Sequence, residues 1–138
     1  MLRPAGKRCD MRFFMLMTVF ITGLGTVVSA ASVLGTWQTG PDKKGQVAHV
    51  EARPCGEAVC GWIVRSYDAE GKPITTANIG KRVFWNMTPV GDGEYRGRAW
   101  VPAHDREYAA RMALEGRQLT VSGCVGPFCQ SQVWSRVE

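Results

Sequence analysis

Apolar and polar residues alternate along most of the chain after residue 32, and short glycine-containing segments interrupt the alternation. Because successive side chains of a β-strand point to opposite faces, this period of two predicts half-buried strands joined by turns. We expect eight strands, over residues 33–39, 45–53, 60–67, 80–89, 94–101, 107–114, 117–125 and 128–137. The pattern indicates an all-β protein.

Eight consecutive antiparallel strands would leave two unpaired edges if the sheet stayed open. The tight-turn sequences "GDG" at 91–93 and "EG" at 115–116 favour successive hairpins. We therefore expect a small eight-stranded up-and-down barrel, with a two-sheet sandwich as the alternative. A barrel of this size is filled by its own side chains or holds one small ligand.

The alternation also predicts which side chains point into the barrel, once Cys124 and Cys129 are placed outside. The residues expected to point inward are Val50, Ala52, Ile63, Leu119, Val121, Gly123, Val125, Phe128, Gln130, Gln132, Trp134 and Arg136. His49, Glu51 and Arg53 are expected to point outward. Two glutamines and an arginine on an inner face are unusual, because a buried polar group costs a few kcal/mol unless it has partners. They either find partners at the barrel ends or line a wet pocket.

The beginning of the chain has the pattern of a secretory signal peptide. Four basic residues precede an apolar run from Phe13 to Val28, and the small residues "VSAAS" follow. We assign residues 1–30 to the signal, with cleavage after Ala30 or Ala31, and residues 32–138 to a single domain. An uncleaved anchor is the alternative, but the run is shorter than the roughly 20 residues that span a bilayer. Cys9 precedes the apolar run and would leave with the signal.

Removal of the signal changes the charge of the protein. The signal contains four of the 17 basic residues and one of the 12 acidic residues. The remainder therefore has 13 basic and 11 acidic residues, and its net charge is +2 instead of +5. No basic run remains, and nucleic acid is therefore not an expected partner. We expect a periplasmic or secreted protein that meets a membrane only through its signal peptide.

Four cysteines remain in two pairs with equal spacing, Cys55 with Cys60 and Cys124 with Cys129. Zinc-ligand pairs usually lie on turns shaped for tetrahedral coordination, and a redox motif more typically has the sequence C-x-x-C. No histidine lies beside either pair. Because paired cysteines of exported proteins are usually disulfides, we expect two local bridges. Crossed pairing of the four stays open.

Each bridge would span a tight hairpin. In "CVGPFC" a two-residue turn at Gly126-Pro127 would set Cys124 opposite Cys129, at a Cα separation of about 4.5 Å that a disulfide tolerates. The sequence "CGEAVC" would fold in the same way, with Glu57-Ala58 at its tip.

Three further segments occur together: "LGTW", "RPCGEAVCGWIV" and "GCVGPFCQSQVWSRV". With them the chain resembles a family of small exported bacterial proteins, domain of unknown function 2147. The matching residues are Gly35, Trp37, Pro54, Cys55, Gly56, Cys60, Gly61, Ile63, Val64, Gly97, Pro102, Tyr108, Gln132, Trp134 and Arg136. The resemblance covers essentially the whole chain after the signal, and the first cysteine hairpin is its most specific part.

The resemblance implies a lipocalin-like barrel in which a tryptophan closes one end and an arginine of the last strand packs over it. Trp37 and Arg136 occupy these positions, which implies structural roles for both. The chain departs from the family where residues 99–102 lack the usual acidic residue, and where Asp105 replaces a common turn glycine. The family has no generally assigned reaction, so the resemblance informs the fold more than the function.

A binding module for an apolar or amphipathic small molecule is the first functional hypothesis. An aromatic wall with a few polar anchors is the usual composition of a ligand pocket. The candidate pocket residues are Tyr108, Gln130, Gln132 and Trp134. Core packing is the simpler role for Trp37, Trp85 and Trp134.

A structural or interaction protein of the cell envelope is the second hypothesis. Arg96, Arg98 and Trp100 are expected in one row on the outer face, where they could contact a glycan, an anionic lipid headgroup or a protein. A solvated charged face is the simpler interpretation of such a row.

An enzyme is the least expected class. His104, Asp105, Glu107 and Tyr108 form the only cluster of acid–base groups, and adjacent residues of a strand point apart. The sequence has no serine elbow, phosphate loop or metal-spaced histidine pair. We therefore expect no catalytic residues, no metal site and no cofactor.

Overall fold

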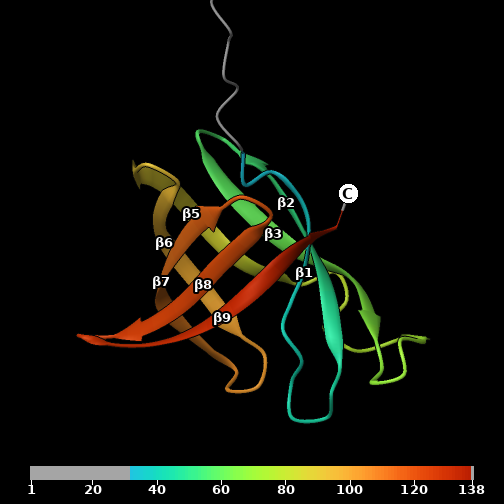
Figure 1. The fold of residues 1–138 in the computed structure, drawn as a ribbon. Helices are drawn as coiled ribbons and strands as arrows, with labels where there is room; N and C mark the ends of the chain where they lie inside the picture. Colours follow the sequence, from blue (N-terminus) through green and yellow to red (C-terminus); the bar gives the residue numbers. More distant parts are fainter. Residues whose placement is uncertain (1–31, 138) are drawn as a thin grey trace, which may run out of the picture.

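The computed structural model describes residues 32–137, and the expected signal peptide with Cys9 lies outside them. This part of the chain forms nine strands joined mainly by short turns (Figure 1). The strands are β1 Gly35–Gln38, β2 Val47–Cys55, β3 Ala58–Tyr67, β4 Pro73–Ile74, β5 Arg82–Gly91, β6 Glu94–Val101, β7 Arg106–Glu115, β8 Gln118–Val125 and β9 Phe128–Val137.

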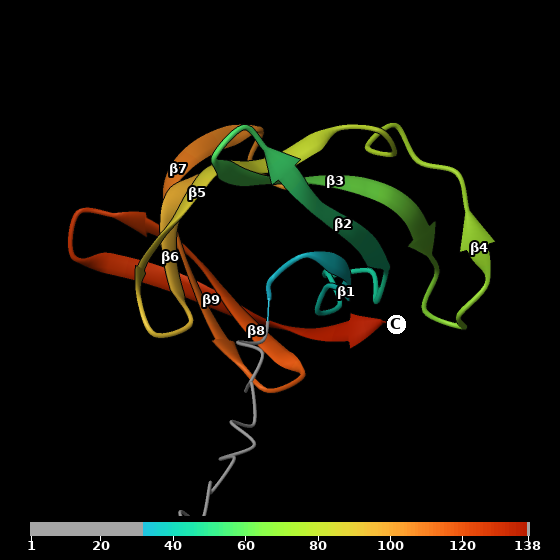
Figure 2. The ribbon, with the colours of Figure 1, turned by 90° about the horizontal axis from the view of Figure 1, so that it is seen from above.

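Eight of these strands close into a barrel. From β5 to β9 each strand pairs with the next, β9 pairs with β1, and β1, β2, β3 and β5 complete the ring. Figure 2 shows the strands around a common axis, with β4 attached outside the ring. The two-residue β4 pairs with β3 alone and was not expected. The predicted eight-stranded antiparallel barrel is confirmed, and the open sandwich is wrong.

Side chains from every strand of the ring fill the interior. Val50, Ala52 and Ile63 point inward as expected and are buried. The largest fully buried side chains are those of Trp37, Phe84, Met87, Met112 and Leu119. Burial of one large apolar side chain contributes about 1.5–3 kcal/mol, so these residues supply much of the stability of the barrel.

Two glycines permit close contacts within the wall. A Cβ atom on Gly61 would lie 2.2 Å from the Phe84 ring, which packs directly onto this glycine. A Cβ atom on Gly97 would lie 2.6 Å from the carbonyl oxygen of Trp85. Beside it, Asn86 has a left-handed φ of 55° and interrupts the regular pairing of β5 with β6. A side chain at either glycine would therefore force the wall apart.

The first hairpin turns one residue earlier than expected. Its tip is Gly56-Glu57, and Cys55 pairs with Ala58. Gly56 has a φ of 64°, a left-handed conformation that glycine adopts without a steric penalty. The expected tip at Glu57-Ala58 is wrong because it would place this glycine within a strand.

Both cysteine pairs form local disulfides, without crossed pairing. Cys124 lies directly opposite Cys129 with a Cα separation of 4.1 Å, across the expected turn. Cys55 and Cys60 are diagonal neighbours 5.6 Å apart at Cα, because Cys60 pairs with Arg53. Each bridge therefore joins the two strands of one hairpin close to its tip.

The N-terminal segment closes one end of the barrel, at the top of Figure 1. The Trp37 indole is fully buried, and its Nε1 donates to the Val33 carbonyl at 2.8 Å. The Arg136 guanidinium lies 4.2 Å from the centre of that ring and donates to the carbonyl oxygens of Leu34 and Ser32. These contacts tie the segment before β1 to the last strand.

Candidate functional site

The inner face of the β8–β9 hairpin is open to solvent at the end away from Trp37. Val125 is 65% exposed and Phe128 is 80% exposed, and Gln130 and Gln132 are exposed as well. The strand register places all four on the same face as buried Trp134, as expected. Because the hairpin projects beyond the ring of strands (Figure 1), these side chains are not enclosed, and the expectation of burial is wrong.

Gln132 links the core to the loop between β1 and β2. Its Oε1 accepts a hydrogen bond from Trp134 Nε1 at 2.6 Å, and its Nε2 donates to the Gly40 carbonyl at 3.4 Å. Both polar ends of this side chain therefore have partners. Gln132 acts as a positioning residue for the loop.

The other two candidate pocket residues lie apart from this link. Tyr108 is half-buried, and its hydroxyl forms a 3.0 Å hydrogen bond with His104 Nδ1. Gln130 is exposed on the neighbouring part of β9. The four candidates thus share the inner face, but only Gln132 and Trp134 are joined by a hydrogen bond.

The acid–base cluster at residues 104–108 is divided between separate contacts. His104 contacts Tyr108, whereas Asp105 Oδ1 accepts a hydrogen bond from Trp100 Nε1 at 3.0 Å. Asp105 has a left-handed φ of 46°, which explains why glycine suits this turn position. His104 and Asp105 therefore point to different partners and form no dyad.

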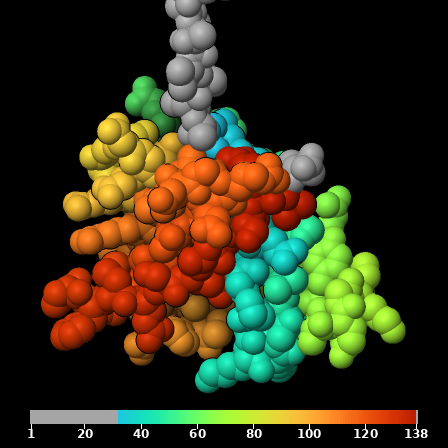
Figure 3. Space-filling view, viewed as in Figure 1, coloured from blue at the N-terminus to red at the C-terminus, as the bar shows by residue number. Residues whose placement is uncertain are grey.

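A crevice that the sequence analysis did not identify lies on the outer face of β1, β2 and β3. Its volume is about 500 Å³, within the range of 300–1,000 Å³ that is common for small-molecule sites. The residues that line it are Gln38, Gly45, Val47, His49, Tyr67, Asp68, Ala69 and Gly71. Figure 3 shows the two segments that border it, the loop at 39–46 in cyan and the segment after β3 in yellow-green.

Two rings in a tilted contact form the floor of this crevice. The His49 and Tyr67 ring centres lie 4.7 Å apart, and His49 Nε2 lies 3.2 Å from Gln38 Oε1. In the register, Val47 pairs with Tyr67 and His49 with Arg65, which places these side chains on one face. His49 lies on the outer face as expected, but it is only 9% exposed.

Burial keeps His49 neutral near physiological pH. Desolvation lowers its pKa below the ordinary value of 6.5, and the positive charge of Arg65 lowers the pKa further. The Gln38 carbonyl oxygen accepts from Nε2, so the other nitrogen, Nδ1, is a hydrogen-bond acceptor. Nδ1 is buried and has no partner within the described part of the chain. The crevice therefore contains a neutral, partly unsatisfied imidazole.

The two bordering loops have the same local structure and touch each other. In both, an aspartate precedes a glycine by three residues, and the glycine N–H donates to the aspartate carbonyl at 3.0 Å. These pairs are Asp42 with Gly45 and Asp68 with Gly71. A Cβ atom on Gly45 would lie 2.9 Å from Ala69 Cβ, so the loops meet over the crevice. The repeated Asp-x-x-Gly sequence was the only signal that could have related them.

Three tryptophans lie on the outer face beneath cations. Arg53 lies 5.2 Å from the ring centre of Trp62, and Arg82 lies 4.7 Å from that of Trp85. Lys81 lies 5.1 Å from the ring centre of Trp100. The core role expected for Trp85 is wrong, because Phe84 takes the inner position and Trp85 pairs with Arg98 outside.

The outer row expected on β6 has the predicted orientation. Arg96 and Arg98 are exposed, and Trp100 is half-buried next to them on the same face.

Within residues 32–137, histidine, cysteine and acidic side chains do not gather in groups of three that could hold a metal ion. The same residues contain no helix with the length and apolarity needed to cross a membrane.

The closed ring, together with Trp37 and Arg136 at its end, defines a lipocalin-like barrel. A solved structure of protein HP1028 from Helicobacter pylori, which is described as belonging to the lipocalin family, has the same fold with a TM-score of 0.63. The two chains are 15% identical, and the match covers 78% of this chain and 84% of the other. The likeness therefore concerns the fold alone.

The chain belongs to the family described as "uncharacterized protein conserved in bacteria (DUF2147)", whose model matches residues 35–136. The resemblance inferred from the sequence is thereby confirmed. A comparison with curated proteins finds no significant match.

Proposed function

We propose that this protein is an exported, non-catalytic binder of a small amphipathic molecule, and that the crevice at His49 and Tyr67 is its binding site. The observation that carries the proposal is a crevice of about 500 Å³ with the His49 and Tyr67 rings in tilted contact at its floor. Eight-stranded barrels are also a common scaffold for proteins that hold one small ligand. The expected signal peptide and the two disulfides support export, because disulfides persist in oxidising compartments.

The lining indicates the chemistry of the ligand. Tyr67, Val47 and Ala69 offer apolar surface, whereas the exposed Gln38 amide offers hydrogen bonds without a charge. A ligand with a flat or aliphatic body and a hydroxyl or amide group matches this combination.

Native and denaturing mass spectrometry of protein purified from an oxidising compartment tests the proposal directly. We expect the native mass to include a small molecule that denaturation releases. Binding is then measured by fluorescence with N-phenyl-1-naphthylamine, an uncharged apolar probe, for the wild type and for Tyr67→Ala. Because a buried aromatic ring supplies a large contact area, we expect Tyr67→Ala to weaken binding about tenfold.

Tyr108→Ala is the matched control, since Tyr108 is also a half-buried tyrosine but lies on the inner face. It should bind the probe as the wild type does. Loss of binding in Tyr108→Ala with full binding in Tyr67→Ala would place the site on the open inner face. A bare native mass and no saturable probe binding would contradict the binding function itself.

A further inference from the structure

Two arginines lie directly opposite each other on the outer face of the barrel, away from the crevice. Arg96 of β6 pairs with Arg111 of β7, and both side chains are exposed. Side chains that face each other in an antiparallel ladder have Cβ atoms about 4.5–5.5 Å apart, and like charges there destabilise the sheet. A counter-charge would therefore stabilise two adjacent positive charges at this position.

The described chain does not supply that counter-charge. Arg98, on the same face of β6, lies 3.8 Å from the Glu107 carboxylate. Within residues 32–137, neither Arg96 nor Arg111 forms an ion pair or a side-chain hydrogen bond. Glu94 lies two residues before Arg96 on the same face, but it pairs with neither arginine. The guanidinium groups are thus available to an anion from solution.

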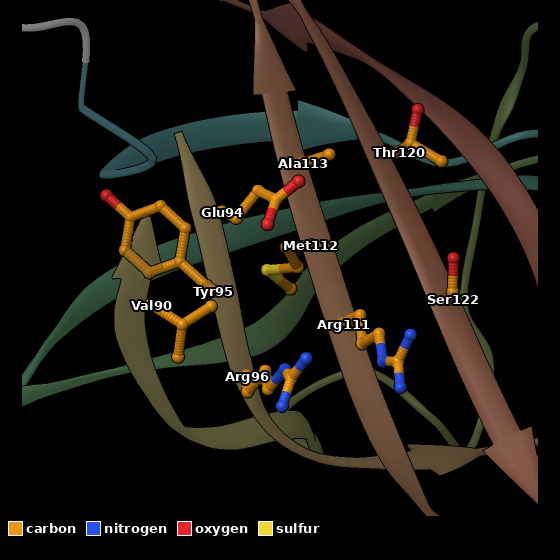
Figure 4. A pocket seen from close by; sticks show the side chains of 9 residues that line it. All are labelled: Val90, Glu94, Tyr95, Arg96, Arg111, Met112, Ala113, Thr120 and Ser122. Atoms are coloured by element: carbon orange, nitrogen blue, oxygen red, sulfur yellow. The ribbon is translucent and has the colours of Figure 1, made fainter. Parts of the chain in front are cut away.

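A small pocket lies beside the arginine pair. Figure 4 shows the Arg96 and Arg111 guanidinium groups at one end, the Glu94 carboxylate at the other, and Thr120 and Ser122 along one side. Its volume is about 130 Å³. The pocket suits a tetrahedral oxyanion and is too small for most whole ligands, which need about 300 Å³ or more.

The groups around the pocket match the chemistry of a phosphate. A guanidinium binds phosphate through two parallel N–H···O bonds, and hydroxyl groups add further donors. Ser122 Oγ is already oriented by a 2.7 Å hydrogen bond to Ser131 Oγ. We infer that this pocket binds a phosphate group, with Arg96 and Arg111 on its oxygens and Ser122 as a further donor. The Glu94 carboxylate repels the phosphate, which therefore lies at the arginine end of the pocket, and Glu94 can accept a hydrogen bond from a hydroxyl or amine attached to that phosphate.

A soluble phosphate and a phospholipid headgroup both present this chemistry, and two experiments separate them. The first is calorimetric titration of the disulfide-bonded protein with inorganic phosphate. The second is co-sedimentation with phosphatidylcholine vesicles that contain or lack phosphatidylglycerol. Each is done with the wild type, with Arg96→Gln and with Arg111→Gln. Arg53→Gln is the control, because Arg53 is an outer-face arginine that already has a carboxylate partner, Glu51, at 2.8 Å.

We expect saturable phosphate binding that each of the two substitutions weakens about tenfold or more, because each removes charged hydrogen bonds. The control should bind as the wild type does. Sedimentation that depends on Arg111, with or without phosphatidylglycerol, would identify a lipid headgroup as the source, because both lipids carry a phosphate. Phosphate binding without such sedimentation would identify a soluble ligand. Absence of both, or equal binding by Arg111→Gln and the wild type, overturns the inference.

Thermal unfolding separates a ligand-binding arginine from a structural one. In phosphate-free buffer, Arg111→Gln should unfold at or above the wild-type Tm, because the substitution relieves repulsion between like charges. Phosphate at matched ionic strength stabilises both proteins through its general effect as a salt. Because only the wild type keeps the full binding site, phosphate should raise the Tm of the wild type more than that of the variant. A variant with a lower Tm in phosphate-free buffer would show that Arg111 stabilises the barrel itself, and would contradict the inference.

Discussion

Arg136 and Trp37 are cross-strand neighbours on β9 and β1, and the guanidinium lies 4.2 Å from the centre of the indole ring. The same guanidinium donates to the carbonyl oxygens of Leu34 and Ser32. One side chain therefore joins the last strand, the core tryptophan and the segment that precedes β1.

Arg136→Gln should lower the free energy of unfolding by about 2–3 kcal/mol. The substitution removes a cation–π contact worth about 1–2 kcal/mol and charged hydrogen bonds to two carbonyl oxygens. Urea denaturation followed by tryptophan fluorescence measures the change. The matched control is Arg53→Gln, because Arg53 also lies over a tryptophan, at 5.2 Å from Trp62, but is exposed. Equal losses in the two variants would show that the closure has no special importance.

Gly61→Ala should destabilise the barrel by about 1–3 kcal/mol, because the new methyl group would lie 2.2 Å from the Phe84 ring and force it to move. Gly123→Ala is the control, since its methyl group would find its nearest neighbour, Tyr108, at 3.7 Å. That variant should unfold as the wild type does. Thermal denaturation of both variants provides the comparison, and a stable Gly61→Ala protein would show that Phe84 packs differently in solution.

Each disulfide should contribute about 2 kcal/mol, because each closes a short loop with a sequence separation of 5. The double variant Cys124→Ser with Cys129→Ser should lose that amount in urea denaturation. The oxidised wild type should weigh about 4 Da less than the fully reduced protein. A wild-type mass that does not change on reduction would contradict both bridges.

The stability of the protein should fall as the pH drops below about 6.5, and His49 should cause part of that fall. Burial and Arg65 hold the pKa of His49 below its ordinary value, so the unfolded chain takes up a proton first on acidification. The contribution is fully present above the unfolded pKa and is lost below it, at no more than about 1.4 kcal/mol per pH unit.

Urea denaturation between about pH 7 and about pH 5.5 measures this effect. His49→Gln should have a flatter profile than the wild type. Parallel profiles for the wild type and His49→Gln would contradict the assignment.

Alternation predicted the core where the strands are regular and failed where the backbone departs from regularity. Val50, Ala52 and Ile63 are buried as expected, because β2 and β3 pair regularly from Val50 to Cys55, and the register shifts only beyond Val50, towards His49. In β5 the left-handed Asn86 separates the inner residues Phe84 and Met87 by three positions, and a period of two cannot represent this. Irregular pairing depends on the neighbouring strand, so a single strand sequence does not reveal it.

The crevice was missed for a different reason. It exists because Gly45 and Ala69, which belong to separate loops, come into contact above His49. Each loop taken alone is an ordinary polar turn, and only the closed barrel brings the two together. Similarly, the outward position of His49 was predictable, whereas its burial depends on the contact between the loop at 39–46 and the segment after β3, which the sequence of β2 alone does not show.

The pairing of the first strand with the last has a consequence for the order of folding. A chain that is synthesised or exported from its N-terminus can form the β2–β3 hairpin early, because both strands are close in sequence. β1 receives its second partner only when residues 135–137 have emerged, since Arg136 meets the N-terminal segment across 104 positions. Until then the growing sheet has open edges that can pair with other chains. Chaperones that bind incomplete chains would therefore protect these edges most just before β9 emerges.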